Sequence, residues 1–344
     1  AGRYRWAGAF LVLWLGAIIL AGGYLLSRDS RTFAETRYQI LLVPALCLAW
    51  GRALDRLWAW RRPAGALGLV LMVGIMVAAL PFDWSPANRR EDWRVAAAYV
   101  SAHAGPNDAI LIQADYVHIA FQRYFHGPQD VFYPFTDRLT DPAQVDGPLA
   151  GMHDFATVWV VQSHHEALDP GNLVLNWFGA RYPQVTEVFP TGVAIHAYRQ
   201  QYRTAALPAD LAGAAAPAAL GPIRLLACRY QPATLPARDA VLHPPSNWIH
   251  VTTYWSLAGG TGGKDLVPRI RLTDGQGQVW GEEMDRPGGA FHVWPTAAWL
   301  PGEIVAADGD VNLNPVTPPG PYRLEIEAPG QAGKAVCGQA TITP

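Results

Sequence analysis

The chain has few cysteines, few lysines and few charged residues of any kind. Three cysteines in 344 residues exclude a small fold held together by disulfides. Two lysines and a net charge of −2 argue against a nucleic-acid-binding protein, so no nucleic-acid partner is expected. Charged residues make up 16% of the chain and hydrophobic residues 50%, a balance that excludes intrinsic disorder. A chain of this length and composition is expected to form two or three folded domains.

The charge is unevenly distributed along the chain. Residues 1–82 contain nine arginines and three acidic residues, a net charge of +6, whereas residues 83–344 carry a net charge of −8. The first part also contains two long runs without a charged residue, Ala7–Leu26 and Ala64–Phe82. Twenty residues of helix span about 30 Å, the thickness of the hydrocarbon core of a bilayer. Residues 1–82 are therefore expected to form a membrane domain.

We predict three transmembrane helices in this domain, at about residues 7–26, 38–60 and 64–82. The middle helix requires Arg52 and Arg56 to reach the interface along their own side chains. The first run also fits a secretory signal peptide, but it is longer than an ordinary signal-peptide core and no clear small-residue cleavage site follows it.

The arginines do not fix the orientation of these helices, because six lie on each side of the membrane in this arrangement. The compact basic loop Arg52–Arg62 favours the cytoplasmic side for that loop. Residues 83–344 are then expected outside the cytoplasm.

Residues 83–203 alternate between helical and strand periodicity, which predicts a small Rossmann-like α/β domain. The expected elements are helices at 91–104, 116–125 and 172–182, strands at 109–113 and 157–162, and a hairpin-like pair at 185–199. Gln113-Ala114-Asp115-Tyr116 follows the first strand in place of a glycine-rich phosphate loop, so a nucleotide site is not expected. Asp115 and Tyr116 lie at the carboxyl end of that strand, where open α/β sheets bind ligands, and are candidate contacts for an acceptor.

The remainder of the chain alternates with a period of two residues. Residues 204–222 are rich in alanine, proline and glycine and are expected to be a linker. Residues 223–344 contain segments such as YRLEIEA and VTTYWSL, which predict an all-β sandwich. Cys228 and Cys337 lie near the start and end of this domain and form a candidate disulfide if it lies outside the cytoplasm; two unpaired buried thiols are the alternative.

Three segments carry a resemblance to a known family. They are RYQILLVPAL (37–46), REDWRVAAAYVSAHAGPNDAILIQADYVHIAFQRYF (90–125) and PTAAWLPGEIVAADGDVNLNPVTPPGPYRLEI (295–326). The first resembles a segment near the end of the membrane region in polytopic glycosyltransferases of the GT-C type, relatives of the protein mannosyltransferases and the lipid A aminoarabinose transferase. The second resembles the soluble segment that follows in bacterial members, and the third is similar to a β-sandwich appended to some of them.

The resemblance implies a multi-pass enzyme of the bacterial plasma membrane, of which this chain is the C-terminal part. A carboxylate upstream of this chain would act as general base on an acceptor hydroxyl that displaces a polyprenyl phosphate from the sugar. Since that acidic loop is absent here, no catalytic residue is assigned and the fragment is expected to be inactive alone. No cofactor is expected in it, and a divalent metal in the complete enzyme is left open. The implied partners are the lipid bilayer, a polyprenyl-phosphate-linked sugar and an acceptor that the sequence does not specify.

Arg37 and Tyr38 are the candidate residues for binding the lipid phosphate, because cations near the membrane face would stabilise its charge. Arg28 and Arg31 are second choices. The alternative for Arg37 is an interfacial arginine that contacts lipid headgroups, with Tyr38 as an ordinary aromatic residue of the interface.

Other groupings of reactive residues are weaker. His164, His165 and Glu166 are adjacent on an extended segment, where neighbouring side chains point to opposite faces and rarely bind one metal, so no metal site is assigned. The tryptophans of the last domain offer either a carbohydrate-binding platform or core packing. A second hypothesis is therefore a non-enzymatic, membrane-anchored protein that displays a sandwich for carbohydrate or protein binding.

Overall fold

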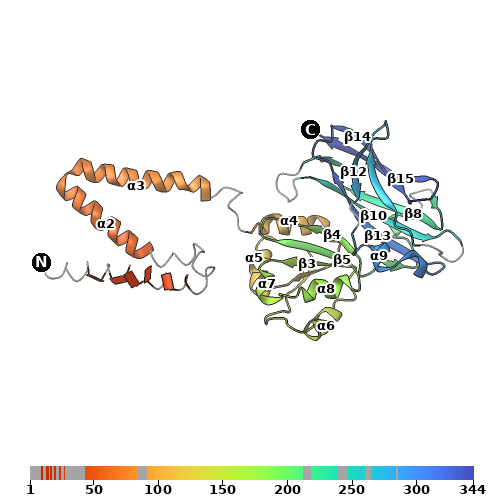
Figure 1. The fold of residues 1–344 in the computed structure, drawn as a ribbon, viewed down its shortest axis with the longest axis horizontal. Coiled ribbons are helices and arrows are strands. Elements are labelled where there is room, and N and C mark those ends of the chain that lie inside the picture. The colour runs from red at the N-terminus through yellow and green to blue at the C-terminus, as the bar shows by residue number, and fades with distance from the viewer. Residues whose placement is uncertain are drawn as a thin grey trace. The chain divides into compact units, whose positions relative to one another are not determined.

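The computed structural model describes residues 43–83, 91–211, 218–238, 246–259, 265–283 and 286–344, together with isolated positions between 9 and 27. The chain divides into two compact units, residues 1–89 and 90–344. The first unit is helical where it is described, and the second contains two β-sheets with their helices (Figure 1).

Two consecutive helices form the described part of the first unit. Helix α2 comprises Val43–Trp60 and helix α3 comprises Arg62–Asp83. A side chain at Gly65 would place its Cβ 2.6 Å from the Trp58 ring, so glycine allows the start of α3 to lie directly on α2.

The predicted fold class, a membrane domain with three spans before the two other domains, is wrong in the part of the chain that the structure describes. One described helix, Arg62–Pro81, has the length and composition to cross a membrane. Helix α2 covers most of the second predicted span, but Arg52, Asp55 and Arg56 lie within it. A charge at the centre of a spanning helix costs about 2.5–3.5 kcal/mol of insertion free energy. The three charges therefore make α2 unfavourable as a membrane-spanning helix. Most of the first predicted span lies outside the described residues.

A mixed five-stranded sheet opens the second unit. Its elements are α4 (Trp93–His103), β1 (Ala109–Ile112), η3 (Asp115–Val117), α5 (His118–Gln122), β2 (Asp130–Phe132), α6 (Ala143–Ala150), β3 (Thr157–Gln162), α7 (His165–Leu168), α8 (Leu173–Gly179), β4 (Gln184–Val188) and β5 (Ala194–Arg199). The strand order is β2-β1-β3-β5-β4. Strands β1, β2 and β3 are parallel, whereas β5 is antiparallel to both of its neighbours.

The hairpin-like pair expected at 185–199 is present, and it makes the sheet mixed rather than the parallel sheet of a Rossmann fold. A parallel continuation needs a crossover of a dozen or more residues. Only residues 189–193 separate β4 from β5, so these two strands form an antiparallel hairpin.

Helices cover both faces of this sheet (Figure 1). On one face, Tyr99 of α4 meets Trp159 of β3 edge-on, with ring centroids 6.3 Å apart. On the other face, Phe178 of α8 stacks on Tyr198 of β5 at 5.2 Å. Because side chains alternate along a strand, Arg199 lies on the same face as α4.

The remaining strands form one ten-stranded sheet. Its elements are β6 (Arg203–Thr204), η4 (Ala209–Leu211), β7 (Ala218–Leu220), β8 (Ile223–Gln231), β9 (Thr234–Pro236), β10 (Trp248–Leu257), β11 (Arg269–Thr273), β12 (Val279–Glu283), α9 (Ala290–Val293), η5 (Thr296–Ala298), β13 (Ile304–Leu313), β14 (Gly320–Glu327) and β15 (Lys334–Thr343). The strand order is β7-β8-β10-β13-β12-β11-β14-β15-β9, and β6 pairs with β13.

This sheet resembles a sandwich but is not built from two separate sheets, which is a second correction to the predicted fold. Strand β12 pairs with both β13 and β11, so the ladder is continuous. Long sheets coil because each strand is twisted relative to the next. The curled sheet brings β15 against β8, where Cys228 and Cys337 form a disulfide with their Cα atoms 5.7 Å apart. Its inner face carries the apolar core, including Ile249, Val251 and Trp255.

Candidate functional site

Polar side chains gather on the outer face of β10 and β13, opposite the apolar core. Asp308 and Asp310 are two residues apart on β13 and therefore point to the same side. His250 of β10 is paired with Asp310, and Thr252 is paired with Asp308. This face packs against β4 and β5 of the five-stranded sheet rather than against solvent.

The two aspartates accept hydrogen bonds from both sheets. Asp308 accepts from the Nε and Nη2 atoms of Arg199 at 2.5 and 2.7 Å, and from the Thr252 hydroxyl at 2.7 Å. Asp310 accepts from the Thr186 hydroxyl at 2.7 Å and from Arg286. The aspartate side chains are only 3% and 5% exposed. The cluster therefore joins the two sheets through buried, hydrogen-bonded charges.

His250 lies between the two aspartates. Its Nδ1 is 2.7 Å from Asp310 and its Nε2 is 3.3 Å from Asp308. Since a carboxylate only accepts hydrogen bonds, both ring nitrogens are protonated here. Burial lowers the pKa of His250, but the hydrogen bonds and charges of the two aspartates outweigh it and raise the pKa to about 9.

The carboxylates respond in the opposite direction. Burial raises the pKa of Asp308, yet the neighbouring charges of Arg199 and His250 outweigh this effect and hold that pKa well below its ordinary range. The pKa of Asp310 is lowered in the same way by His250 and Arg286, against burial. At neutral pH the cluster therefore holds three cations and two anions.

A cavity of about 280 Å³ adjoins this cluster, and we call it the intersheet pocket. It is lined from both sheets and from α4, mainly by aromatic and hydrogen-bonding side chains: Tyr99, His103, Asp108, Thr157, Trp159, Arg199, Arg229, Tyr230, Gln231, His250 and Thr252.

His103 and Asp108 supply acceptor atoms to the intersheet pocket. The His103 ring stacks on Tyr99 at 4.1 Å, and its Nδ1 donates to the Tyr99 carbonyl oxygen at 2.8 Å, which leaves Nε2 as an acceptor. Burial lowers the pKa of His103 and so favours the neutral ring. Asp108 accepts from Trp159 Nε1 at 3.0 Å and from the Gly105 amide at 2.7 Å, and burial raises its pKa.

Arg229 supplies a cation at the rim. Its side chain is about half exposed and is paired with Asp210 of η4. Gln231 follows two residues later on the same strand and therefore points to the same side, where it adds an amide. The pocket thus offers both donors and acceptors around aromatic rings.

The residues predicted to contact an acceptor lie elsewhere, at the opposite end of β1. The Tyr116 hydroxyl donates to the His164 carbonyl oxygen at 2.8 Å, and Asp115 pairs with His118 at 3.2 Å. Neither Asp115 nor Tyr116 lines the intersheet pocket. At this end of β1 the Gln113 side-chain amide donates to Asp169 at 2.6 Å, and both side chains are buried.

The other predicted site residues have mixed outcomes. Arg37 and Tyr38, like Arg28 and Arg31, lie outside the described residues. The structure brings Cys228 and Cys337 together in a disulfide.

The tryptophans do not form an exposed platform. Trp255 and Trp299 are buried in the core of the curled sheet, and Trp280 and Trp294 pack against it. In the described part of the chain, no group of three or more histidine, cysteine, aspartate or glutamate residues is arranged to hold a metal ion.

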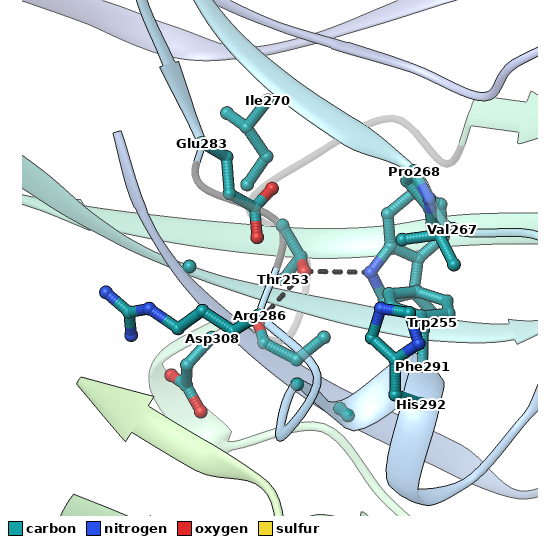
Figure 2. Close-up of a pocket in the computed structure, with 14 residues that line it drawn as sticks. Thr253, Trp255, Val267, Pro268, Ile270, Glu283, Arg286, Phe291, His292 and Asp308 are labelled. Carbon is teal, nitrogen blue, oxygen red and sulfur yellow. Dashed lines mark hydrogen bonds between the residues drawn. The ribbon is translucent and has the colours of Figure 1, made fainter. Parts of the chain in front are cut away.

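A second hollow lies inside the curled sheet, beside Trp255, Ile270 and Phe291 (Figure 2). The Trp255 Nε1 donates to the Thr253 hydroxyl at 2.8 Å in its wall. The hollow measures only about 30 Å³, which is room for water rather than for a ligand. The intersheet pocket is therefore the stronger candidate site.

The sequence did carry a signal for the charged cluster, although we did not predict it. In IVAADGDVNL (304–313), Asp308 and Asp310 keep the alternation of a strand. His250 likewise alternates with the apolar Ile249 and Val251. A polar face of a strand ordinarily faces water, so alternation alone does not reveal that a second sheet covers it.

Comparison of the chain with protein-family models and with curated proteins returned no match. The functional argument therefore rests on the geometry of the site.

Proposed function

We propose that residues 91–344 form a saccharide-binding module and that the intersheet pocket binds one sugar unit of a glycan. The observation that carries this proposal is the wall of the pocket, which mixes hydrogen-bond donors and acceptors with aromatic rings. A sugar needs this mixture, because each hydroxyl both donates and accepts and the C–H face of the ring packs on aromatic surfaces.

The size of the pocket supports a single ring. Pockets for drug-sized ligands measure roughly 300–1,000 Å³. A cavity of about 280 Å³ suits one monosaccharide unit with the rest of a glycan outside.

The pairing of the cations supports a neutral ligand. Arg199 and His250 line the pocket, but each is already paired with a buried aspartate of the cluster, and Arg229 is paired with Asp210. A phosphate would need cations that are not already paired. A polyhydroxy ligand uses the remaining hydrogen-bonding positions without disturbing these pairs.

In this proposal the module serves glycosyl transfer at a bacterial membrane. Support comes from the resemblance of residues 37–46, 90–125 and 295–326 to GT-C glycosyltransferases, from the apolar helix α3 and from the disulfide, which is typical of proteins outside the cytoplasm. The module would hold a sugar of the acceptor or of the polyprenyl-phosphate donor while catalytic groups outside this chain react. An anchored display protein would use the same pocket, and a transfer assay on the complete gene product separates the two.

Binding of monosaccharides to the full chain in detergent tests the proposal. We expect a neutral hexose or pentose to change the tryptophan fluorescence, because Trp159 lines the pocket. Arg229→Ala should weaken binding about tenfold, the loss expected for one hydrogen bond to a charged group.

Arg224→Ala is the matched control, because Arg224 is exposed on the same strand but does not line the pocket. It should bind like the unchanged protein. Equal affinity of the Arg229→Ala variant, or no response to any neutral sugar, would contradict the proposal.

A further inference from the structure

Four large side chains are exposed on η3, α5 and the end of β2. Tyr116 is 58% exposed, Ile119 70%, Tyr124 42% and Tyr133 40%, and we call them the aromatic patch. The buried Phe121 fixes the inner side of α5, and the exposed Ile119 lies on its solvent side. Exposed aromatic and aliphatic side chains close together in one segment are a candidate interaction surface.

One ring contact links the end of β2 to the helix beneath the patch. His118 of α5 stacks on Tyr133 at 4.2 Å with the rings nearly parallel, which ties the end of β2 to the helix. Asp115, the acidic residue of η3, pairs with the same histidine.

The patch adjoins the first residues of the second unit. The Tyr116 hydroxyl donates to the His164 carbonyl oxygen, and the His164 ring pairs with Glu91. The Arg94 guanidinium lies over the Tyr124 ring, 5.5 Å from its centroid. Tyr124 therefore contacts the entry of the chain into this unit directly, and Tyr116 is linked to it through His164.

This entry is covalently close to the apolar helix α3. Eight peptide steps separate Asp83 from Glu91, and a step spans at most about 3.5 Å, so the chain permits no more than about 28 Å between them. Helix Arg62–Pro81 is long and apolar enough to cross a bilayer. If α3 does so, the patch lies within reach of the lipid surface.

We propose that the aromatic patch rests on the bilayer that α3 enters. Tyrosine is enriched at membrane interfaces, where its ring is apolar and its hydroxyl remains hydrated. Ile119 would enter the boundary of the acyl chains, and the cations of Arg94 and Arg123 would face anionic headgroups. A lipid surface suits this patch because exposed aromatic rings stand beside arginine side chains.

This contact is a property separate from saccharide binding, and it would orient the intersheet pocket relative to the bilayer. Asp108 of the intersheet pocket precedes β1, whereas Tyr116 of the patch follows it. The two therefore lie at opposite ends of the strand. A module resting on the patch would hold the pocket away from the lipid, on the side where a glycan is accessible.

A fluorescent label at Ile119→Cys tests the contact in the full chain. The chain is reconstituted singly in nanodiscs of phosphatidylcholine and phosphatidylglycerol, with Cys47 replaced by serine and an environment-sensitive dye attached. We expect blue-shifted emission and at least roughly twofold quenching by a lipid that carries a nitroxide near its headgroup. Arg123→Glu should reduce this quenching by weakening the attraction to anionic lipid.

Val316→Cys is the matched control, because Val316 is an aliphatic residue 73% exposed on the curled-sheet domain. Its label should remain in water and unquenched. Equal hydration of the labels at Ile119→Cys and Val316→Cys would overturn the proposal. A label at Ile119→Cys that is shielded from water but not quenched by the nitroxide lipid would also overturn it, and would indicate a protein partner or a second copy of the chain. Since no sugar is present, this result is independent of saccharide binding.

Discussion

At the scale of single residues, His250 is central to the contact between the two sheets. Each of its ring nitrogens faces a buried aspartate, and those aspartates also accept from Arg199 of β5 and Thr186 of β4. Buried charges of this kind need partners in every direction, because an unpaired one is strongly destabilising. The state of one imidazole therefore affects how firmly the two sheets are joined.

This arrangement predicts a defined pH dependence of stability. The pKa of His250 is about 9 in the folded protein and about 6.5 when unfolded, so protonation favours the folded state. Its contribution is complete below pH 6.5 and is lost as the pH rises through 9. Asp308 has a lowered pKa and contributes fully above about pH 4. Urea unfolding between pH 4 and pH 9.5 should give the largest contribution of this cluster at pH 4–6.5.

Replacement of the imidazole isolates its share of this dependence. His250→Gln should lower the free energy of unfolding at pH 6 by about 3 kcal/mol, because it removes the cation that both buried carboxylates share and leaves each with one arginine. The difference from the unchanged protein should shrink as the pH approaches 9.5. His126→Gln, at an exposed histidine, is the control. A His250→Gln difference that is the same at pH 6 and pH 9.5 would show that His250 is not charged in the fold.

At the scale of elements, strands that are apolar on both faces could be predicted from the sequence. A strand whose polar face is covered by a distant sheet could not. Strands β1 and β3 were predicted because they are fully buried and apolar. The role of strand β13 was not predicted, because its alternating polar face at Asp308 and Asp310 is typical of a strand face exposed to water. Its partners, β4 and β5, lie more than 100 residues away in sequence, and no local pattern reports such a contact.

The glycine of β12 gives a prediction at this scale. Gly281 lies so close to β13 that an added Cβ would be 2.6 Å from the backbone oxygen of Asn312. A backbone atom within a ladder cannot move aside cheaply, so Gly281→Ala should destabilise the protein by about 1–3 kcal/mol. Thermal and urea unfolding measure this change.

Gly275→Ala provides the comparison within the same hairpin. An added Cβ there meets nothing within 4 Å, so the variant should stay within about 0.5 kcal/mol of the unchanged protein. Equal stability of the two variants would show that β12 and β13 are not packed as described.

At the scale of the whole molecule, the disulfide closes the curled sheet. Cys228 and Cys337 are 109 residues apart, and the bond restricts the unfolded chain over that distance. Replacing both by alanine should lower the free energy of unfolding by about 2–5 kcal/mol. Cys47→Ala, at an exposed free cysteine, should have little effect. Identical urea midpoints for the double variant and the unchanged protein would contradict this assignment.

The errors at this scale share one physical origin. Apolar runs identified the helices near the N-terminus. They did not show that the charges within α2 leave it too polar for a membrane-spanning helix. Alternation identified the strands of the last domain, such as β10 and β14, but not that β12 links them into one curled sheet. Periodicity describes an element, whereas pairing and burial depend on partners that are distant in the sequence.

Hydrogen exchange of the full chain, with and without a bound neutral sugar, tests the central claim most directly. A saccharide in the intersheet pocket should slow exchange in the segments that line it, at residues 99–108, 157–159 and 229–231. Segments remote from the pocket, such as β14, should be unchanged. Protection confined to another surface, or no protection at a sugar concentration that saturates binding, would contradict the account.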